Sequence, residues 1–299
     1  MEPTTNKALT ATYRLQLHKD FPFSSARAIL PYLRRLGVSH VYTSPVLSAS
    51  PGSKHGYDVT DPTTVNPELG GEVERKAFVH ALRREGLGWM LDIVPNHMGT
   101  GATNRFWEDL LASGQRSPYA RWFDIDWDAP ESWLRGRVML PVLEDELESV
   151  LARAEISVVH EGGKPRIRYG TRTLPLSVES IEKLEESDDS IAGEARGSRP
   201  VGREEPDSFS GGAPRTGKLS PSRLRALLDA QHYALVHWRR ASREVNYRRF
   251  FDINELVGLR TEDPSVFDDL HSLPLEWIAA DELQALRIDH IDGLLDPLQ

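Results

Sequence analysis

The sequence contains no cysteine, and this absence removes several classes of chemistry. Without cysteine the chain has no disulfide bond, no thiolate nucleophile and no cysteine-ligated metal. It also lacks any run of about 18 apolar residues, which a membrane-spanning helix would need. The first residues have neither the basic nor the apolar segment of a secretory signal. We therefore expect a soluble, cytoplasmic protein with no membrane partner.

An excess of basic residues is also missing. The net charge is −9 over 299 residues, and phosphate binding needs a basic surface, so we expect no nucleic-acid partner. With 39% hydrophobic and 27% charged residues, the chain can form two average domains or one α/β barrel of roughly 250 residues. The acidic balance suits an uncharged ligand such as a sugar.

The first 100 residues alternate short apolar runs with helical patterns, which is typical of a parallel sheet. Glycines 37 and 86 follow the two helical patterns, where a left-handed residue often ends a helix. We expect Ser24 or Ser25 to cap the first helix, and Pro31 to kink or shorten it. The predicted strands are residues 12–17, 38–42 and 87–94, and the predicted helices are 24–36 and 72–85.

The alternation stops between residues 99 and 245, which we interpret as an inserted subdomain containing Trp107, Trp122, Trp127 and Trp133. Residues 182–218 are polar and rich in Gly and Pro, so they predict a mobile loop. We expect a helix from Ser220 whose apolar side extends to Leu235 and Trp238. The barrel pattern returns near residue 250 with helices from 263 and over 275–284, and a strand over 285–289. The predicted segments are 1–98, 99–245 and 246–299.

Two polar clusters follow predicted strands. Asp92 and Asn96 end the third strand, with His97 expected on the turn that leaves it, and Arg287 and Asp289 lie two residues apart in the fourth. Alternate strand residues share a face, and barrel enzymes place their chemistry at the carboxyl ends of the strands. The neighbouring guanidinium favours the ionised carboxylate that a nucleophile requires. Alone, the first cluster equally fits a polar strand end with a surface histidine, and the second a structural ion pair.

A third stretch, residues 54–70, follows the second strand and contains Tyr57. Its ring could lie flat under a sugar, although a packed loop aromatic is the simpler interpretation of Tyr57 alone. All three stretches follow successive predicted strands, so we expect them at one end of the sheet.

Together these stretches resemble the α-amylase superfamily of glycoside hydrolases and transglycosidases. Within it, further motifs are similar to the maltooligosyltrehalose synthase family. They are residues 12–16 (TYRLQ), 42–45 (YTSP), 249–256 (RFFDINEL) and 287–294 (RIDHIDGL). The resemblance extends from about residue 8 to the last residue, except for the predicted loop.

The resemblance implies the N-terminal part of a (β/α)8 TIM barrel, about four βα units, with a subdomain inserted after strand three. It implies that Asp289 is the nucleophile that forms a β-linked glucosyl-enzyme, that Arg287 orients it and that Asp92 supports Arg287. His97 would bond sugar hydroxyls, and Tyr57 would stack on the sugar. The residues expected to bind substrate are Tyr57, Asp92, His97, Arg287 and His290.

The implied reaction converts the reducing-end α-1,4 linkage of a maltooligosaccharide to α-1,1, without cofactor or metal. In the superfamily the acid/base Glu follows strand five, and a third Asp follows strand seven; this chain ends just past strand four. We therefore expect an incomplete, inactive part of an enzyme, completed by a C-terminal part or a second chain. The alternatives are another superfamily hydrolase or transglucosylase, and a non-catalytic carbohydrate-binding derivative.

Overall fold

The computed structural model describes residues 8–184 and 219–298. The chain divides into two units, which we describe separately. Unit 1 comprises the residues up to Trp107, residues 121–125 and the residues from Tyr247 onward; unit 2 comprises Glu108–Ala120 and Asp126–Asn246. Most of the predicted loop over 182–218 lies outside the described residues. Within the described ranges, no helix is both long and apolar enough to span a membrane.

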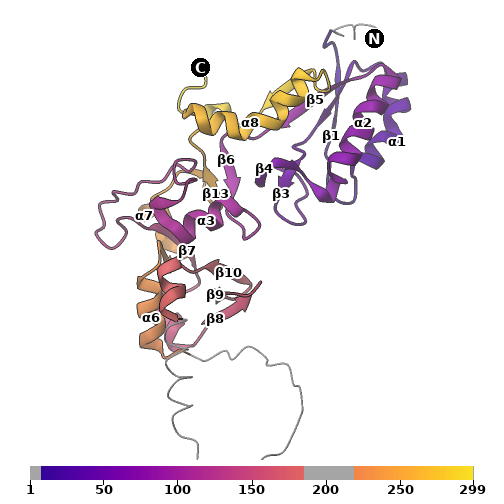
Figure 1. Cartoon of the computed structure of the whole chain (residues 1–299). Coiled ribbons are helices and arrows are strands. Elements are labelled where there is room, and N and C mark those ends of the chain that lie inside the picture. Colours follow the sequence, from indigo (N-terminus) through magenta and orange to yellow (C-terminus); the bar gives the residue numbers. More distant parts are fainter. Residues whose placement is uncertain (1–7, 185–218, 299) are drawn as a thin grey trace, which may run out of the picture. The chain divides into compact units, whose positions relative to one another are not determined.

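Unit 1 is built on a four-stranded parallel sheet in the order β1-β2-β5-β14, of which Figure 1 labels β1 and β5. The strands lie close to their predicted positions: β1 (Thr12–Leu15), β2 (His40–Thr43), β5 (Gly88–Ile93) and β14 (Ala285–Ile288). The register places Arg14 beside Tyr42, and Asp92 beside Arg287. Polar side chains from distant parts of the sequence therefore lie on neighbouring strands.

Three helices pack with this sheet: α1 (Phe23–Leu36), α2 (Gly71–Glu85) and α8 (Pro264–Ala279). The predicted serine cap of α1 is wrong, because the helix starts at Phe23 after an extended Pro22 and has no side-chain cap. Pro31 lies within α1 without ending it. Its position is exposed, while Leu30 and Leu33 are buried and hold the helix to the core on both sides of the proline.

The prediction of separate helices from residue 263 and over 275–284 is also wrong, because α8 runs through Pro274 as one helix. Its beginning is as predicted: the Asp263 side chain accepts a hydrogen bond from the Ser265 amide at 2.9 Å. Trp277 is buried in the last turn and stacks on Trp89 of β5, with ring centroids 5.6 Å apart. This contact holds the C-terminal half of α8 in the core.

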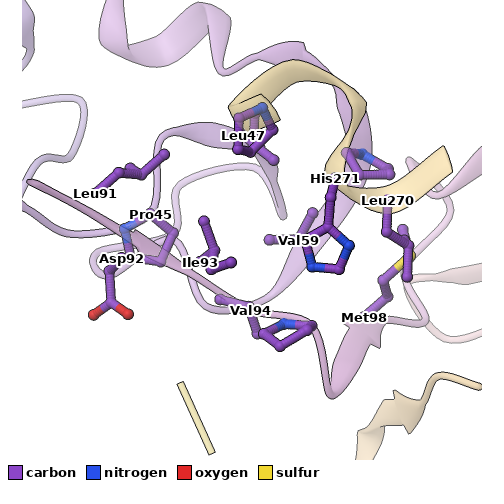
Figure 2. Close-up of a pocket in the computed structure, with 13 residues that line it drawn as sticks. Pro45, Leu47, Val59, Leu91, Asp92, Ile93, Val94, Met98, Leu270 and His271 are labelled. Carbon is purple, nitrogen blue, oxygen red and sulfur yellow. The ribbon is translucent and has the colours of Figure 1, made fainter. Parts of the chain in front are cut away.

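The core of unit 1 centres on Trp89, which is fully buried. The Phe78 ring packs edge-on against the Trp89 ring, with centroids 5.9 Å apart. The indole Nε1 of Trp89 donates to the Thr43 hydroxyl at 2.9 Å. A small, mainly apolar cavity of about 30 Å³ lies between β5, β4 and α8 (Figure 2). Its volume is that of about one water molecule, too small for a substrate.

Short strands and 3₁₀ turns complete unit 1. Residues 43–71 contain an antiparallel pair, β3 (Leu47–Ala49) with β4 (Val59–Val65), and the 3₁₀ turn η1 (Pro67–Leu69). A second antiparallel group has the order β12-β13-β6. Its strands are β6 (His97–Gly99), β12 (Arg249–Phe250) and β13 (Ile253–Gly258); η4 (Ile291–Gly293) follows β14.

Unit 2 contains a parallel pair, β7 (Val138–Leu143) with β11 (Tyr233–His237), and an antiparallel sheet of β8 (Ile156–Glu161), β9 (Lys164–Tyr169) and β10 (Arg172–Pro175). Ser220 caps α6 (Pro221–Asp229), as its position predicts. The expected extension of this helix to Trp238 is wrong, because the run from Tyr233 to Val236 forms a strand against β7. The other elements are α3 (Arg105–Ser113), within which the division falls, η2 (Gly114–Arg116), α4 (Leu147–Ala152), η3 (Trp238–Arg240) and α7 (Ala241–Glu244).

The four tryptophans of the predicted insertion have different environments. Trp107 and Trp122 belong to unit 1, where both are buried. Trp127 is half-buried and Trp133 is exposed in unit 2. The predicted segment boundaries at 98/99 and 245/246 stay a prediction.

Candidate functional site

Every strand of the parallel sheet contributes one side chain to a connected polar network. These side chains are Arg14, Tyr42, Asp92 and Arg287, from β1, β2, β5 and β14. Tyr57, from the loop before β4, joins them. The strands are parallel, so these residues lie toward one end of the sheet, where α/β proteins place their ligand sites.

Asp92 is the centre of this network. Its carboxylate is buried, and the hydroxyls of Tyr42 and Tyr57 both donate to its Oδ2 at 2.6 Å. Figure 2 shows the carboxylate pointing away from the small apolar cavity. Burial, together with the hydrogen bond to Asp92, raises the pKa of Tyr57 to about 12. Tyr57 is therefore a hydrogen-bond donor to Asp92 at neutral pH.

Arg287 bridges two carboxylates. Its Nη1 donates to Asp92 Oδ1 at 3.0 Å and also to the Asp289 carboxylate. Both interactions raise the pKa of Arg287, the one with Asp289 contributing most. The Arg287 side chain is 42% exposed and that of Asp289 15%. The structure thus brings Asp92, Arg287 and Asp289 together and leaves the last two in contact with solvent.

His97 lies in a strand and not on a turn, which corrects the expectation from sequence. It is the first residue of β6, where Gly258 of β13 pairs with it, and its ring is buried. The Phe250 ring packs on it with centroids 4.2 Å apart. Burial lowers the pKa of His97 to about 4, against the opposing effect of the Asp289 charge. The imidazole is therefore neutral at pH 7.

His290 follows β14 in a left-handed conformation, with φ 52°. Its ring packs edge-on against Phe250 at 4.8 Å, so Phe250 contacts both histidines. Gly293 lies so close that an added Cβ would be 2.4 Å from the His290 ring. A larger residue at 293 would displace this ring.

Sequence reasoning missed the roles of several residues here. Arg14 donates to the Tyr57 hydroxyl at 3.1 Å, and Tyr42 bonds to Asp92. Arg248 contacts Asn96 beside His97, and Phe250 packs on the His97 ring. For Arg14 and Tyr42 a signal existed, since both lie in motifs quoted above, residues 12–16 and 42–45, and Tyr42 ends the second predicted strand. Phe250 lies in the motif over residues 249–256, but its contact with His97, like that of Arg248 with Asn96, depends on the pairing of β6 with β13, which cannot be read from periodicity.

Within residues 8–184 and 219–298, no group of three or more His, Asp or Glu side chains is arranged to hold an ion. The negative groups of the site are instead compensated by arginine. That the protein uses no metal and no cofactor remains a prediction.

Comparisons with known proteins show which proteins this chain is similar to. Residues 27–146 match the family described as Alpha amylase, catalytic domain. A putative maltooligosyl trehalose synthase from Mycobacterium tuberculosis is 37% identical over 294 residues, which cover 96% of this chain and 32% of that protein. Along almost all of its length, the chain resembles maltooligosyltrehalose synthases.

Solved structures show the same likeness. A maltooligosyltrehalose synthase from Arthrobacter ramosus has a TM-score of 0.74 and 37% identity, covering 96% of this chain and 32% of its own. A hypothetical maltooligosyl trehalose synthase from Sulfolobus tokodaii gives 0.72 and 35%, covering 97% and 32%. The resemblance stated from the motifs is confirmed. The chain spans about a third of the length of these relatives.

Proposed function

We propose that this chain is part of the catalytic domain of an enzyme that converts the reducing-end α-1,4 linkage of a maltooligosaccharide to α-1,1. The observation that supports this most is the Arg287 guanidinium, which joins Asp92 and Asp289 at one end of the sheet. This arrangement occurs in a chain 37% identical over 96% of its length to a putative maltooligosyl trehalose synthase.

In this proposal Asp289 is the nucleophile. Its carboxylate attacks the anomeric carbon on the non-reducing side of the last linkage, and the reducing-end glucose leaves with the glycosidic oxygen. The anomeric hydroxyl of that glucose then attacks the glucosyl-enzyme, which releases the carboxylate and forms the α-1,1 linkage. Arg287 orients Asp289, and Asp92 holds Arg287 through its own fixed carboxylate.

The substrate-binding roles follow from the same placement. Tyr57 presents its ring to the sugar while its hydroxyl is held by Arg14 and Asp92. His97, neutral and buried, bonds a sugar hydroxyl. His290 contacts the substrate beside the nucleophile.

A retaining reaction needs a second carboxyl group about 5–5.5 Å from the nucleophile, to act as acid and base. Asp92 is unsuited to this role, because Arg287 and two tyrosine hydroxyls already donate to its oxygens. From the resemblance to the superfamily, whose acid/base Glu follows strand five, we assign this role to a glutamate outside residues 1–299. In the same proposal, unit 1 holds four βα units of a barrel, and unit 2 is the subdomain inserted after the third.

Maltopentaose tests the reaction in the whole protein that carries this chain. We expect reducing ends to disappear without loss of total glucose, and residues 1–299 alone to give little or no turnover. A rise in reducing ends would identify a hydrolase instead, and binding without turnover would identify a non-catalytic derivative. Normal turnover by residues 1–299 alone would overturn the assignment of the acid/base to a missing segment.

A further inference from the structure

The guanidinium of Arg248 binds three acceptors around β6. Its Nη1 donates to Asn96 Oδ1 at 2.5 Å, its Nε to Asp124 Oδ2 at 2.9 Å and its Nη2 to the Leu259 carbonyl at 2.6 Å. Gly258 fits against it so closely that an added Cβ would be 2.7 Å from the guanidinium carbon. The position and direction of the Arg248 donors are therefore fixed by several contacts.

These donors determine which way the Asn96 amide points. A guanidinium has no acceptor, so the Asn96 atom that faces Arg248 must be the carbonyl oxygen. The amide nitrogen of Asn96 then faces His97, and it lies 3.3 Å from His97 Nδ1. Asn96 is fully buried, which makes an exchange of its oxygen and nitrogen costly, because a buried donor would then face a donor.

The orientation of Asn96 in turn determines the tautomer of His97. The Asn96 amide donates, so His97 Nδ1 must be the acceptor, and in a neutral ring the proton is then on Nε2. His97 Nε2 is buried and meets no acceptor in hydrogen-bond geometry among the described residues, although the Tyr57 backbone carbonyl is near enough to the ring to raise its pKa. The charged and titratable groups that act on this ring are Asp289, His290 and Arg248.

We propose that Arg248 is a positioning residue: through Asn96 it holds His97 as an Nε2–H donor for an oxygen atom of the substrate. The identification of this oxygen as a sugar hydroxyl rests on the proposed function. The series of contacts from Arg248 through Asn96 to His97 is observed in the structure and is independent of that function. Phe250 packs on the His97 ring and fixes the plane of the imidazole. The hydrogen bond from Asn96 then determines which ring nitrogen carries the proton.

Nitrogen-15 spectroscopy of histidine-labelled whole protein, without substrate, tests this chain of contacts. The His97 signals are identified by their loss in His97→Gln. We expect the neutral ring to carry its proton on Nε2 at pH 7. A proton on Nδ1 in the unmodified protein would overturn the proposal.

Asn96→Asp is the sharpest variant, since it replaces the donor facing His97 by an acceptor of the same shape and keeps an acceptor for Arg248. We expect the neutral ring to move its proton to Nδ1. Arg248→Met should give a mixture of both tautomers, because Asn96 is then free to turn. A retained Nε2–H tautomer in both variants would contradict the proposal.

Arg260→Met is the matched control. Arg260 also pairs with Asp124, at 3.4 Å, but no described contact joins it to Asn96. It should leave the His97 tautomer unchanged, and a shift equal to that of Arg248→Met would show that loss of charge beside Asp124 is the cause. If Arg248→Met fails to fold, Asn96→Asp still decides the question.

Kinetics separate this inference from the proposed function. Arg248→Met should raise KM for maltopentaose about tenfold, the loss of one hydrogen bond to substrate. Arg248→Lys, which keeps a donor for Asn96, should recover part of this loss. If the tautomer of His97 changes in Arg248→Met but neither this variant nor the unmodified protein acts on maltopentaose, the positioning role of Arg248 is supported and the proposed substrate is refuted. An unaltered KM with an altered tautomer would refute the role in substrate binding.

Discussion

Two arginines of unit 1 each bridge two carboxylates, and they differ in accessibility. Arg75 pairs with Glu72 and Glu282, both at 2.7 Å, beneath the Trp277 ring, and its side chain is 1% exposed. Arg287 pairs with Asp92 and Asp289 and is 42% exposed. In the first cluster only the guanidinium is enclosed, since the Glu72 and Glu282 side chains are 44% and 22% exposed, and the cluster ties α2 to the segment after α8. In the second cluster the guanidinium is the exposed partner, so a ligand can reach Arg287 and the Asp289 carboxylate beside it.

Substitution of Arg75, the buried arginine, should have the largest effect on stability. Arg75→Met removes a buried guanidinium together with its two ion pairs and its contact with the Trp277 ring, and the partly exposed Glu72 and Glu282 are then solvated, so we expect the free energy of unfolding to fall by about 2–3 kcal/mol. Turnover per folded molecule should not change. Urea unfolding measures the loss, and Arg34→Met, which removes an exposed pair with Glu85, should cost about 0–1 kcal/mol. Equal losses for the two variants would break the comparison.

Substitution of Arg287, the partly exposed arginine, should mainly affect the rate of the reaction. Arg287→Met deletes the donor that orients Asp289, and we expect kcat/KM on maltopentaose to fall roughly 10²–10³-fold. The free energy of unfolding should fall by about 1–2 kcal/mol, because Asp92 is buried and keeps only its two tyrosine donors. Arg287→Lys, which keeps the charge but not the forked geometry, should recover only part of the rate. A large loss of stability with a normal rate would make Arg287 a second structural arginine.

The pH dependence of the unfolding free energy tests whether the His97 side chain is buried from solvent. Its folded pKa, about 4, is below the unfolded value of about 6.5, so the unfolded state binds more protons between these values. The stability from this group is complete above pH 6.5 and is lost as the pH falls toward 4, by about 3 kcal/mol. His97→Gln should flatten the fall in unfolding free energy measured in that window. An unchanged pH profile would place a solvated histidine at this position.

The two tyrosines should have the smallest effect. Tyr42→Phe or Tyr57→Phe removes one of two hydroxyls that donate to the same Asp92 oxygen. We expect each to lower kcat/KM roughly tenfold, about the energy of one hydrogen bond to a charged group. The double variant should lose more than the product of the two, because either hydroxyl partly compensates for the other. Full additivity would show that the two donors act independently.

Strand alternation predicted much of the site. It placed Arg287 and Asp289 on one face, and the parallel rhythm placed Asp92 at the same end of the sheet. Both are local patterns. The pairing of Asp92 with Arg287 and the convergence of Arg14 and Tyr42 depend on sheet order and register, which single segments do not encode.

Errors arose where long-range contacts outweigh local preference. Pro274 lies inside α8 because Trp277 stacks in the core, and residues 233–236 form a strand because β7 lies beside them. His97 was expected on a turn because its strand partner, β13, is distant in the sequence. Arg248 lies 152 residues from Asn96, so only the fold reveals that contact.

Covalent trapping tests the central assignment most directly. A slowly reacting fluorinated glucosyl donor, given to the whole protein, should leave one glucosyl group on the peptide that contains Asp289, as seen by mass spectrometry. Asp289→Asn should show no adduct under the same conditions, while Asp292→Asn, an exposed neighbour, should label normally. An adduct on another carboxylate, or labelling that survives in Asp289→Asn, would contradict Asp289 as the nucleophile.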